Sequence, residues 1–107
     1  MGLLGGRRYV ARRSAGGLRV LVHHPYGRVA RLAPSGPHEE ARGVSALPDA
    51  FGSAAEAADA IARDVLRRAP EPGLRSQLAR LLAGPAPRIE LDEDDVRALA
   101  SRVARVA

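Results

Sequence analysis

The segment from Ser53 to Ala69, SAAEAADAIARDVLRRA, constrains the fold most because it has the features of a helix with both ends marked. Ser53 and Glu56 have the S-x-x-E spacing of a capping box, in which each side chain accepts a hydrogen bond from the backbone N–H of the other residue. Pro70 disfavours helical geometry at the preceding residue and so predicts the end of the helix. We therefore expect a helix over residues 53–69.

Apolar residues recur along this segment at the spacing that one buried stripe of a helix requires. They are Ala54, Ala57, Ala58, Ile61, Ala62, Val65, Leu66 and Ala69. On the opposite face, Asp59 precedes Arg63 by four positions. Asp64 precedes Arg68 in the same way, and each such pair stabilises a helix by about 0.2–0.5 kcal/mol. Because the alanines allow another backbone to approach closely, we expect the first half of the helix to pack against a sheet.

A β-hairpin is predicted for residues 8–24, where apolar and polar residues alternate around Gly16-Gly17. A two-residue glycine turn tolerates the positive φ angles of tight hairpins, and this turn places Tyr9 opposite His24. One face of the hairpin is then mostly apolar (Tyr9, Ala11, Leu18, Val20, Val22), and the other carries Arg8, Val10, Arg12, Ser14, Arg19, Leu21 and His23. A sheet with one covered side requires this alternation, so the helix is expected to cover the apolar face.

After a turn at Pro25-Tyr26-Gly27, residues 28–33 are expected to form a third strand. Residues 34–52 are rich in Pro, Gly, Ser and charge, and they predict a long loop, which in a small domain is either functional or mobile. Val44, Leu47 and Phe51 are expected to anchor this loop to the core.

Two more helices are predicted in the second half of the chain. The first spans residues 74–83, with Leu74, Leu78, Leu81 and Leu82 on one face. Residues 89–91 form a short extended piece that is a candidate edge strand. The last helix begins with Asp92 as N-cap and has the stripe Val96, Leu99, Ala100 and Val103. Acidic residues crowd its first turn, as the helix dipole favours.

These elements predict a single α+β domain over residues 1–107, with residues 1–6 flexible. Its antiparallel sheet is expected to have three or four strands, one face covered by the central helix, and two further helices. A chain of 107 residues without cysteine can bury such a core without disulfides. The opening MGLLGG is too short for a signal peptide, and no apolar stretch is long enough for a membrane span, so we expect a cytoplasmic protein with no membrane contact.

Recognisable catalytic patterns are absent from the sequence. It has no cysteine, no glycine-rich phosphate loop, no G-x-S-x-G elbow and no H-E-x-x-H motif. The acidic run at residues 92–95 lacks the alternating ligand spacing of a calcium loop. His23 and His24 are adjacent on a strand, so their side chains point to opposite faces. We therefore expect no catalytic residue, no cofactor and no metal ligand, and a protein that is not an enzyme.

Positive charge is concentrated in the first half of the chain. All 17 basic residues are arginines, and the whole net charge of +5 lies in residues 1–52, because residues 53–107 contain equal numbers of arginines and acids. A candidate patch for nucleic acid or an acidic partner consists of Arg7, Arg8, Arg12, Arg19 and Arg31. Such a patch can bind phosphates, although with few aromatic residues the chain has little to stack on bases.

Two functions follow from these features. The first is a non-catalytic interaction protein that acts through a protein partner or through self-association as a homo-oligomer. Its contact would be strand pairing at an exposed sheet edge, either residues 28–32 or residues 89–91. The alternative is a nucleic-acid-binding protein that uses the arginine-rich hairpin.

Two stretches resemble known families. Pro87–Ala107 resembles the opening strand and first helix of ribbon-helix-helix repressors, but the sequence ends where the second helix would begin. The pattern Arg8-Tyr9-Val10, Leu32-Ala33-Pro34 and Phe51-Gly52-Ser53 before AAEAADAIARDVL resembles a family of small uncharacterised α+β domains from bacteria and their phages. In that family a loop rich in glycine and aromatic residues precedes an Ala/Leu helix, whereas this chain lacks tryptophan and most of the loop glycines. The resemblance implies an architecture and no mechanism.

Overall fold

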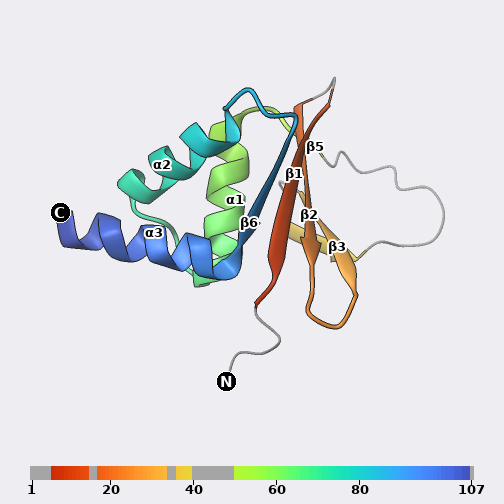
Figure 1. Ribbon diagram of the computed structural model, residues 1–107, viewed down its shortest axis with the longest axis horizontal. Helices are drawn as coiled ribbons and strands as arrows, with labels where there is room; N and C mark the ends of the chain where they lie inside the picture. The colour runs from red at the N-terminus through yellow and green to blue at the C-terminus, as the bar shows by residue number, and fades with distance from the viewer. Residues whose placement is uncertain (1–5, 15–16, 34–35, 40–49, 107) are drawn as a thin grey trace.

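Figure 1 shows the computed structural model, in which three helices lie on one side of an antiparallel sheet. The structure describes residues 6–14, 17–33, 36–39 and 50–106, so most of the predicted flexible segment 1–6 lies outside the described residues. The strands are β1 (Arg8–Ser14), β2 (Gly17–His23), β3 (Val29–Ala33), β4 (Gly36–Glu39), β5 (Ala50–Phe51) and β6 (Arg88–Asp92), and the helices are α1 (Ala54–Leu66), α2 (Pro72–Leu82) and α3 (Glu93–Val106). The strand order is β4-β3-β2-β1-β6, with β5 paired to the start of β2. The α+β class and the cover of one sheet face by a central helix are confirmed.

The predicted hairpin is present as β1 and β2, but its register differs from the predicted one by two residues. Tyr9 is opposite Val22 instead of His24. Gly17 is the first residue of β2 rather than a turn residue, and Gly16 lies outside the described residues. Side chains alternate along a strand with a period of two, so this shift leaves every side chain on its predicted face.

Two short strands, β4 and β5, lie in the segment 34–52 that we predicted to be a loop, which makes the sheet wider than expected. Phe51 of β5 is 1% exposed, as its anchoring role predicts, whereas Val44 and Leu47 lie outside the described residues. β4 pairs with β3 along its length. This pairing corrects the prediction that residues 28–32 form an exposed sheet edge.

Helix α1 begins at the predicted N-cap. The Ser53 backbone is extended, and its Oγ accepts a hydrogen bond from the Glu56 N–H at 3.2 Å. The Glu56 carboxylate reaches one residue further back than in a capping box and accepts from the Gly52 N–H at 3.1 Å. The helix ends before the predicted Ala69, because Arg67 takes the left-handed conformation that closes many helices, with φ of 61°.

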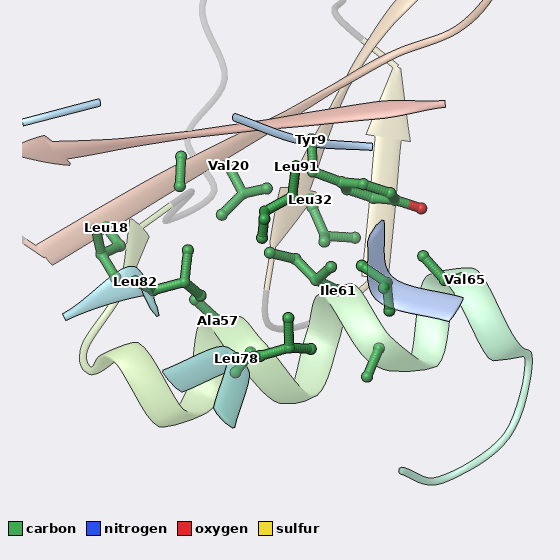
Figure 2. Close-up of a cluster of buried hydrophobic side chains, with 14 of the residues drawn as sticks. Tyr9, Leu18, Val20, Leu32, Ala57, Ile61, Val65, Leu78, Leu82 and Leu91 are labelled. Carbon is green, nitrogen blue, oxygen red and sulfur yellow. The ribbon is translucent and has the colours of Figure 1, made fainter. Parts of the chain in front are cut away.

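The hydrophobic core lies between α1 and the covered face of the sheet, as Figure 2 shows. The predicted α1 stripe contributes Ala57, Ala58, Ile61, Ala62 and Val65, each at most 2% exposed. The sheet contributes mainly Tyr9, Ala11, Leu18, Val20, Val22 and Leu32. Leu74, Leu78 and Leu82 of α2 complete the core, whereas Leu81 is 46% exposed despite its predicted place on the same face. Burial of each large aliphatic side chain contributes about 1.5–3 kcal/mol.

The second half of the chain returns to the sheet through β6, which confirms the predicted edge strand. The structure shows that its partner is β1. Helix α3 follows β6 without a loop, and Asp92 occupies the N-cap position. The Asp92 N–H donates to the Asp95 carboxylate at 2.9 Å, which is one half of a capping box. Arg13 reaches from the covered face of β1 to the end of α2, where it donates to the carbonyls of Leu82 and Gly84. It thereby satisfies oxygens that a helix C-terminus leaves unpaired.

Candidate functional site

The sheet face that the helices do not cover is apolar in its middle and charged around it. Its side chains are Arg8, Val10 and Arg12 of β1, Arg19, Leu21 and His23 of β2, Val29 and Arg31 of β3, and Arg88, Glu90 and Asp92 of β6. Val10 is 3% exposed and Leu21 is partly buried. The arginines of β1, β2 and β6 on this face are exposed. We call this surface the arginine face.

Three arginines lie side by side across adjacent strands of this face. Arg88 of β6 is opposite Arg12 of β1, which is opposite Arg19 of β2. The Arg13 N–H donates to the Pro87 carbonyl oxygen at 3.0 Å. The next pair along, Arg12 with Arg88, is therefore non-hydrogen-bonded, with Cα atoms about 4.5 Å apart. We call these three residues the arginine row, and like charges placed opposite one another in this way destabilise a sheet.

The structure brings some of the predicted arginines together and separates others. Arg12 and Arg19 are directly opposite, and Arg31 of β3 lies diagonally from Arg19. Arg8 is on the same face, but Val10 lies between it and Arg12. The two arginines are four residues apart, which is about 13 Å along the strand. Its Nε lies 3.8 Å from Glu90 Oε1. The predicted patch therefore contains one group around the arginine row and a separate arginine near the other end of β1.

Arg7 does not lie on the arginine face, which corrects its place in the predicted patch. It shares the alternation of Tyr9 and points to the covered side, where Nη1 lies 3.1 Å from Asp64 Oδ2 and Nη2 lies 3.4 Å from Glu93 Oε2. The Tyr9 hydroxyl donates to the same Asp64 carboxylate. Asp64 is thus engaged here rather than with the expected Arg68. This group, which we call the Arg7 cluster, joins the start of β1 to the end of α1 and the start of α3.

Arg88 belongs to the arginine row but not to the predicted patch. The alternation through the extended piece at residues 89–91 does place Arg88 and Glu90 on one face. No local signal, however, indicates that this piece pairs with β1, since its partner lies far away in the sequence. Arg88 Nη2 lies 2.8 Å from Glu90 Oε2, and both side chains are about half exposed, at 55% and 43%. Glu90 therefore balances part of the positive charge at the β6 end of the arginine row.

Three side chains of the Arg7 cluster, Glu93, Tyr9 and Arg7, have shifted pKa values. Burial by itself raises the pKa of Glu93, but hydrogen bonds from the Arg97 side chain, the Arg7 backbone N–H and the Arg7 guanidinium lower it to about 2. Burial also raises the pKa of Tyr9, and its hydrogen bond to Asp64 raises it further. Burial lowers the pKa of Arg7, but Tyr9 and the neighbouring carboxylates outweigh this effect and raise it. At neutral pH, Glu93 and Arg7 are therefore charged and Tyr9 keeps its proton.

The free energy of unfolding should depend on pH at acidic pH because Glu93 is protonated there. Its pKa is about 2 in the folded protein and 4.5 by default, so the stability it contributes is full above pH 4.5 and is lost as the pH falls toward 2. We expect a loss of about 1–2 kcal/mol over this range, allowing for solvent screening. Urea unfolding across this pH range should show that Glu93→Gln removes this loss, whereas the exposed control Glu71→Gln keeps it. An equal pH dependence in both variants would contradict the assignment.

One end of the arginine face is hollowed by a cavity of about 320 Å³. Its charged and titratable lining consists of Arg8, His23, His24, Asp92 and Asp94. Positive and negative groups are mixed here, so the cavity favours no single charge of ligand. Within the described residues, no three histidine, aspartate or glutamate side chains are placed to hold a metal ion.

Among the residues that the structure describes, no helix is long and apolar enough to cross a membrane. The arginine face combines a row of opposed arginines with the nearby Glu90 carboxylate. Comparison with protein-family models, with curated proteins and with solved structures finds no match for this chain.

Proposed function

We propose that this chain is a non-catalytic, cytoplasmic binding protein whose arginine face contacts the phosphates of nucleic acid. The observation that supports this most is the arginine row, Arg88, Arg12 and Arg19, across three adjacent strands. Guanidinium groups in opposed positions repel one another, and Glu90 offsets part of this charge at Arg88. A phosphate backbone laid across the row turns this unfavourable arrangement into attraction and releases counterions from the nucleic acid.

The chemistry of the row suits phosphate groups on an extended backbone. A guanidinium presents a planar fork of donors that matches phosphate oxygens in pairs. Neighbouring strands are about 4.8 Å apart, so the row extends about 10 Å across the sheet. Arg12, in its centre, has no ion-pair partner among the described residues. A phosphate must compete with Glu90 for Arg88, which makes the centre of the row the strongest point of contact.

Binding of this kind is tolerant of sequence. The chain has two tyrosines, one phenylalanine and no tryptophan, so it offers few rings for stacking on bases. Of the aromatic residues, Tyr9 and Phe51 are buried in the core. The arginine face therefore supplies contacts to the backbone, which carry no sequence information by themselves.

Fluorescence anisotropy with labelled single-stranded and duplex oligonucleotides tests the proposal. Binding should weaken steeply between about 50 and 200 mM salt, as counterion release requires. Replacement of Arg12, Arg19 and Arg88 by alanine should lower the slope of log K against log salt by about 0.9 for each duplex phosphate that the variant no longer neutralises. An affinity loss of at least about tenfold at the lower salt concentration is expected.

A matched control separates this site from general attraction by positive charge. Replacement of Arg63, Arg68 and Arg75 by alanine removes the same charge from exposed positions at the helices. This control should keep most of the affinity and the salt slope. The proposal fails if both triple variants lose affinity equally, or if an acidic polypeptide binds the arginine row and nucleic acid does not.

A further inference from the structure

The two outer edges of the sheet differ in their ability to accept another strand. β4 forms one edge and contains Gly36 and Pro37, whereas β6 forms the other and has no proline or glycine. Proline cannot donate a backbone hydrogen bond, and short strands that contain it are poor templates for pairing. The β6 edge is therefore the one on which a further strand can be added.

The backbone groups available on the β6 edge follow from its bonds to β1. The Pro87 carbonyl oxygen accepts from the Arg13 N–H at 3.0 Å, and the Glu93 N–H donates to the Arg7 carbonyl oxygen at 2.9 Å. Both groups therefore point toward β1. Because these groups alternate in direction along an antiparallel strand, those of Arg88, Glu90 and Asp92 point away from β1. The Asp92 N–H is bound by the Asp95 side chain at 2.9 Å, in agreement with this direction. The edge thus offers the N–H and C=O of Arg88 and Glu90.

We infer that a second copy of this chain occupies the edge, with the two β6 strands antiparallel and Ile89 on the two-fold axis. In this register Arg88 of each copy is opposite Glu90 of the other, so all the available backbone groups are paired. Opposite charges then face one another on both sides of the axis, which stabilises cross-strand pairs. A register centred on Glu90 places two carboxylates in opposition and requires the Asp92 N–H, which is already bound.

A groove beside the edge supports the same occupant. It has a volume of about 590 Å³ and lies between α2, α3 and β6, with Leu81, Leu91 and Leu99 among its lining residues. Leu81 is 46% exposed there, and Arg80, Asp95 and Arg102 give the lining both signs of charge. A two-fold axis perpendicular to the sheet keeps the helices of both copies on one side, so the two grooves face each other and each can receive Leu81 of the other. Such an isologous contact requires a surface that complements itself.

The dimer does not rest on the proposed nucleic-acid binding, but it would extend that surface. The same axis keeps the arginine faces of the two copies on one side of a continuous sheet. Each arginine row then ends at the axis, next to Glu90 of the other copy. Glu90 is already shared between Arg8 and the intrachain Arg88, so the ion pairs become a network across the interface.

Sedimentation equilibrium of nuclease-treated protein tests the inference. The native chain should give about twice its mass of 11.3 kDa. Arg88→Glu and Glu90→Arg should each give monomers, because each change places like charges in opposition on both sides of the axis. An equimolar mixture of the two variants should give dimers again, which also shows that both variants fold. A monomeric native chain, or single variants that remain dimeric, would overturn the inference.

The register is tested by single cysteines, since the chain has none. Ile89→Cys should form a disulfide-linked dimer on oxidation, because the two copies of this residue form a non-hydrogen-bonded pair with Cα atoms about 4.5 Å apart. Glu90→Cys should remain unlinked, because its two copies are offset by two residues on neighbouring strands, which places their Cα atoms about 8 Å apart, beyond the limit of about 7 Å. Linkage of Glu90→Cys, or of neither variant, would contradict the proposed pairing.

Discussion

Replacement of Arg7 by alanine should lower the free energy of unfolding by about 2–4 kcal/mol, whereas the same change at the adjacent Arg8 should cost less than about 0.5 kcal/mol. The two arginines are neighbours in the sequence but lie on opposite faces of β1. Removal of Arg7 leaves the Asp64 carboxylate, which is only 10% exposed, with the Tyr9 hydroxyl as its partner and with no cation, whereas Glu93 keeps its ion pair with Arg97 at 2.6 Å. An uncompensated charge in such a position is far more costly than the loss of an exposed pair.

Arg8 provides the matched control because its ion pair is open to solvent. Its Nε lies 3.8 Å from Glu90 Oε1, with side chains 53% and 43% exposed. Denaturant unfolding of both variants should show a shifted midpoint for Arg7→Ala with an unchanged slope, and almost no shift for Arg8→Ala. A double variant with Glu93→Gln should lose less than the sum of its single changes, because the two residues share one network. Equal losses for the two arginine variants would show that the Arg7 cluster contributes little.

The features predictable from the sequence are those set by local periodicity. The α1 stripe and the Ser53 cap follow from spacing within one turn or two of a helix, and both are present. The faces of β1 and β2 are also as predicted although their register is not, since a shift of two residues preserves the alternation. Periodicity therefore predicts which side chains face the core better than it predicts which residues are paired across the strands.

The features that could not be predicted depend on contacts between distant segments. The pairing of β6 with β1 places Arg88 beside Arg12, and no pattern near either residue specifies it. In the same way, Arg7 falls in the predicted patch because its neighbours in the sequence are basic. Its carboxylate partners lie in α1 and α3, and the alternation with Tyr9 is the one local signal of its direction. Adjacent residues of a strand lie on opposite faces of the sheet. The number of basic residues in a strand therefore predicts a surface patch only when each face is counted separately.

Replacement of Gly17 by alanine should destabilise the fold by about 3 kcal/mol or more, while Gly27→Ala should cost about 1 kcal/mol. Both glycines have positive φ, 131° at Gly17 and 92° at Gly27, so alanine is strained at either position. At Gly17 a Cβ would also overlap the carbonyl oxygen of Phe51, an atom of the backbone that cannot turn aside as a side chain does. At Gly27 a Cβ meets nothing within 4 Å.

The difference between the two glycines measures how tightly β5 is held against the start of β2. Leu18 is opposite Phe51 in this pairing, and both are buried in the core, so a displaced Phe51 carbonyl moves core side chains as well as a short strand. In thermal unfolding, each kcal/mol corresponds to a fall in Tm of about 4–8 °C for a domain of this size. Gly17→Ala should therefore melt well below Gly27→Ala. Equal melting temperatures would mean that β5 yields without cost, and that Phe51 is not fixed by the backbone around Gly17.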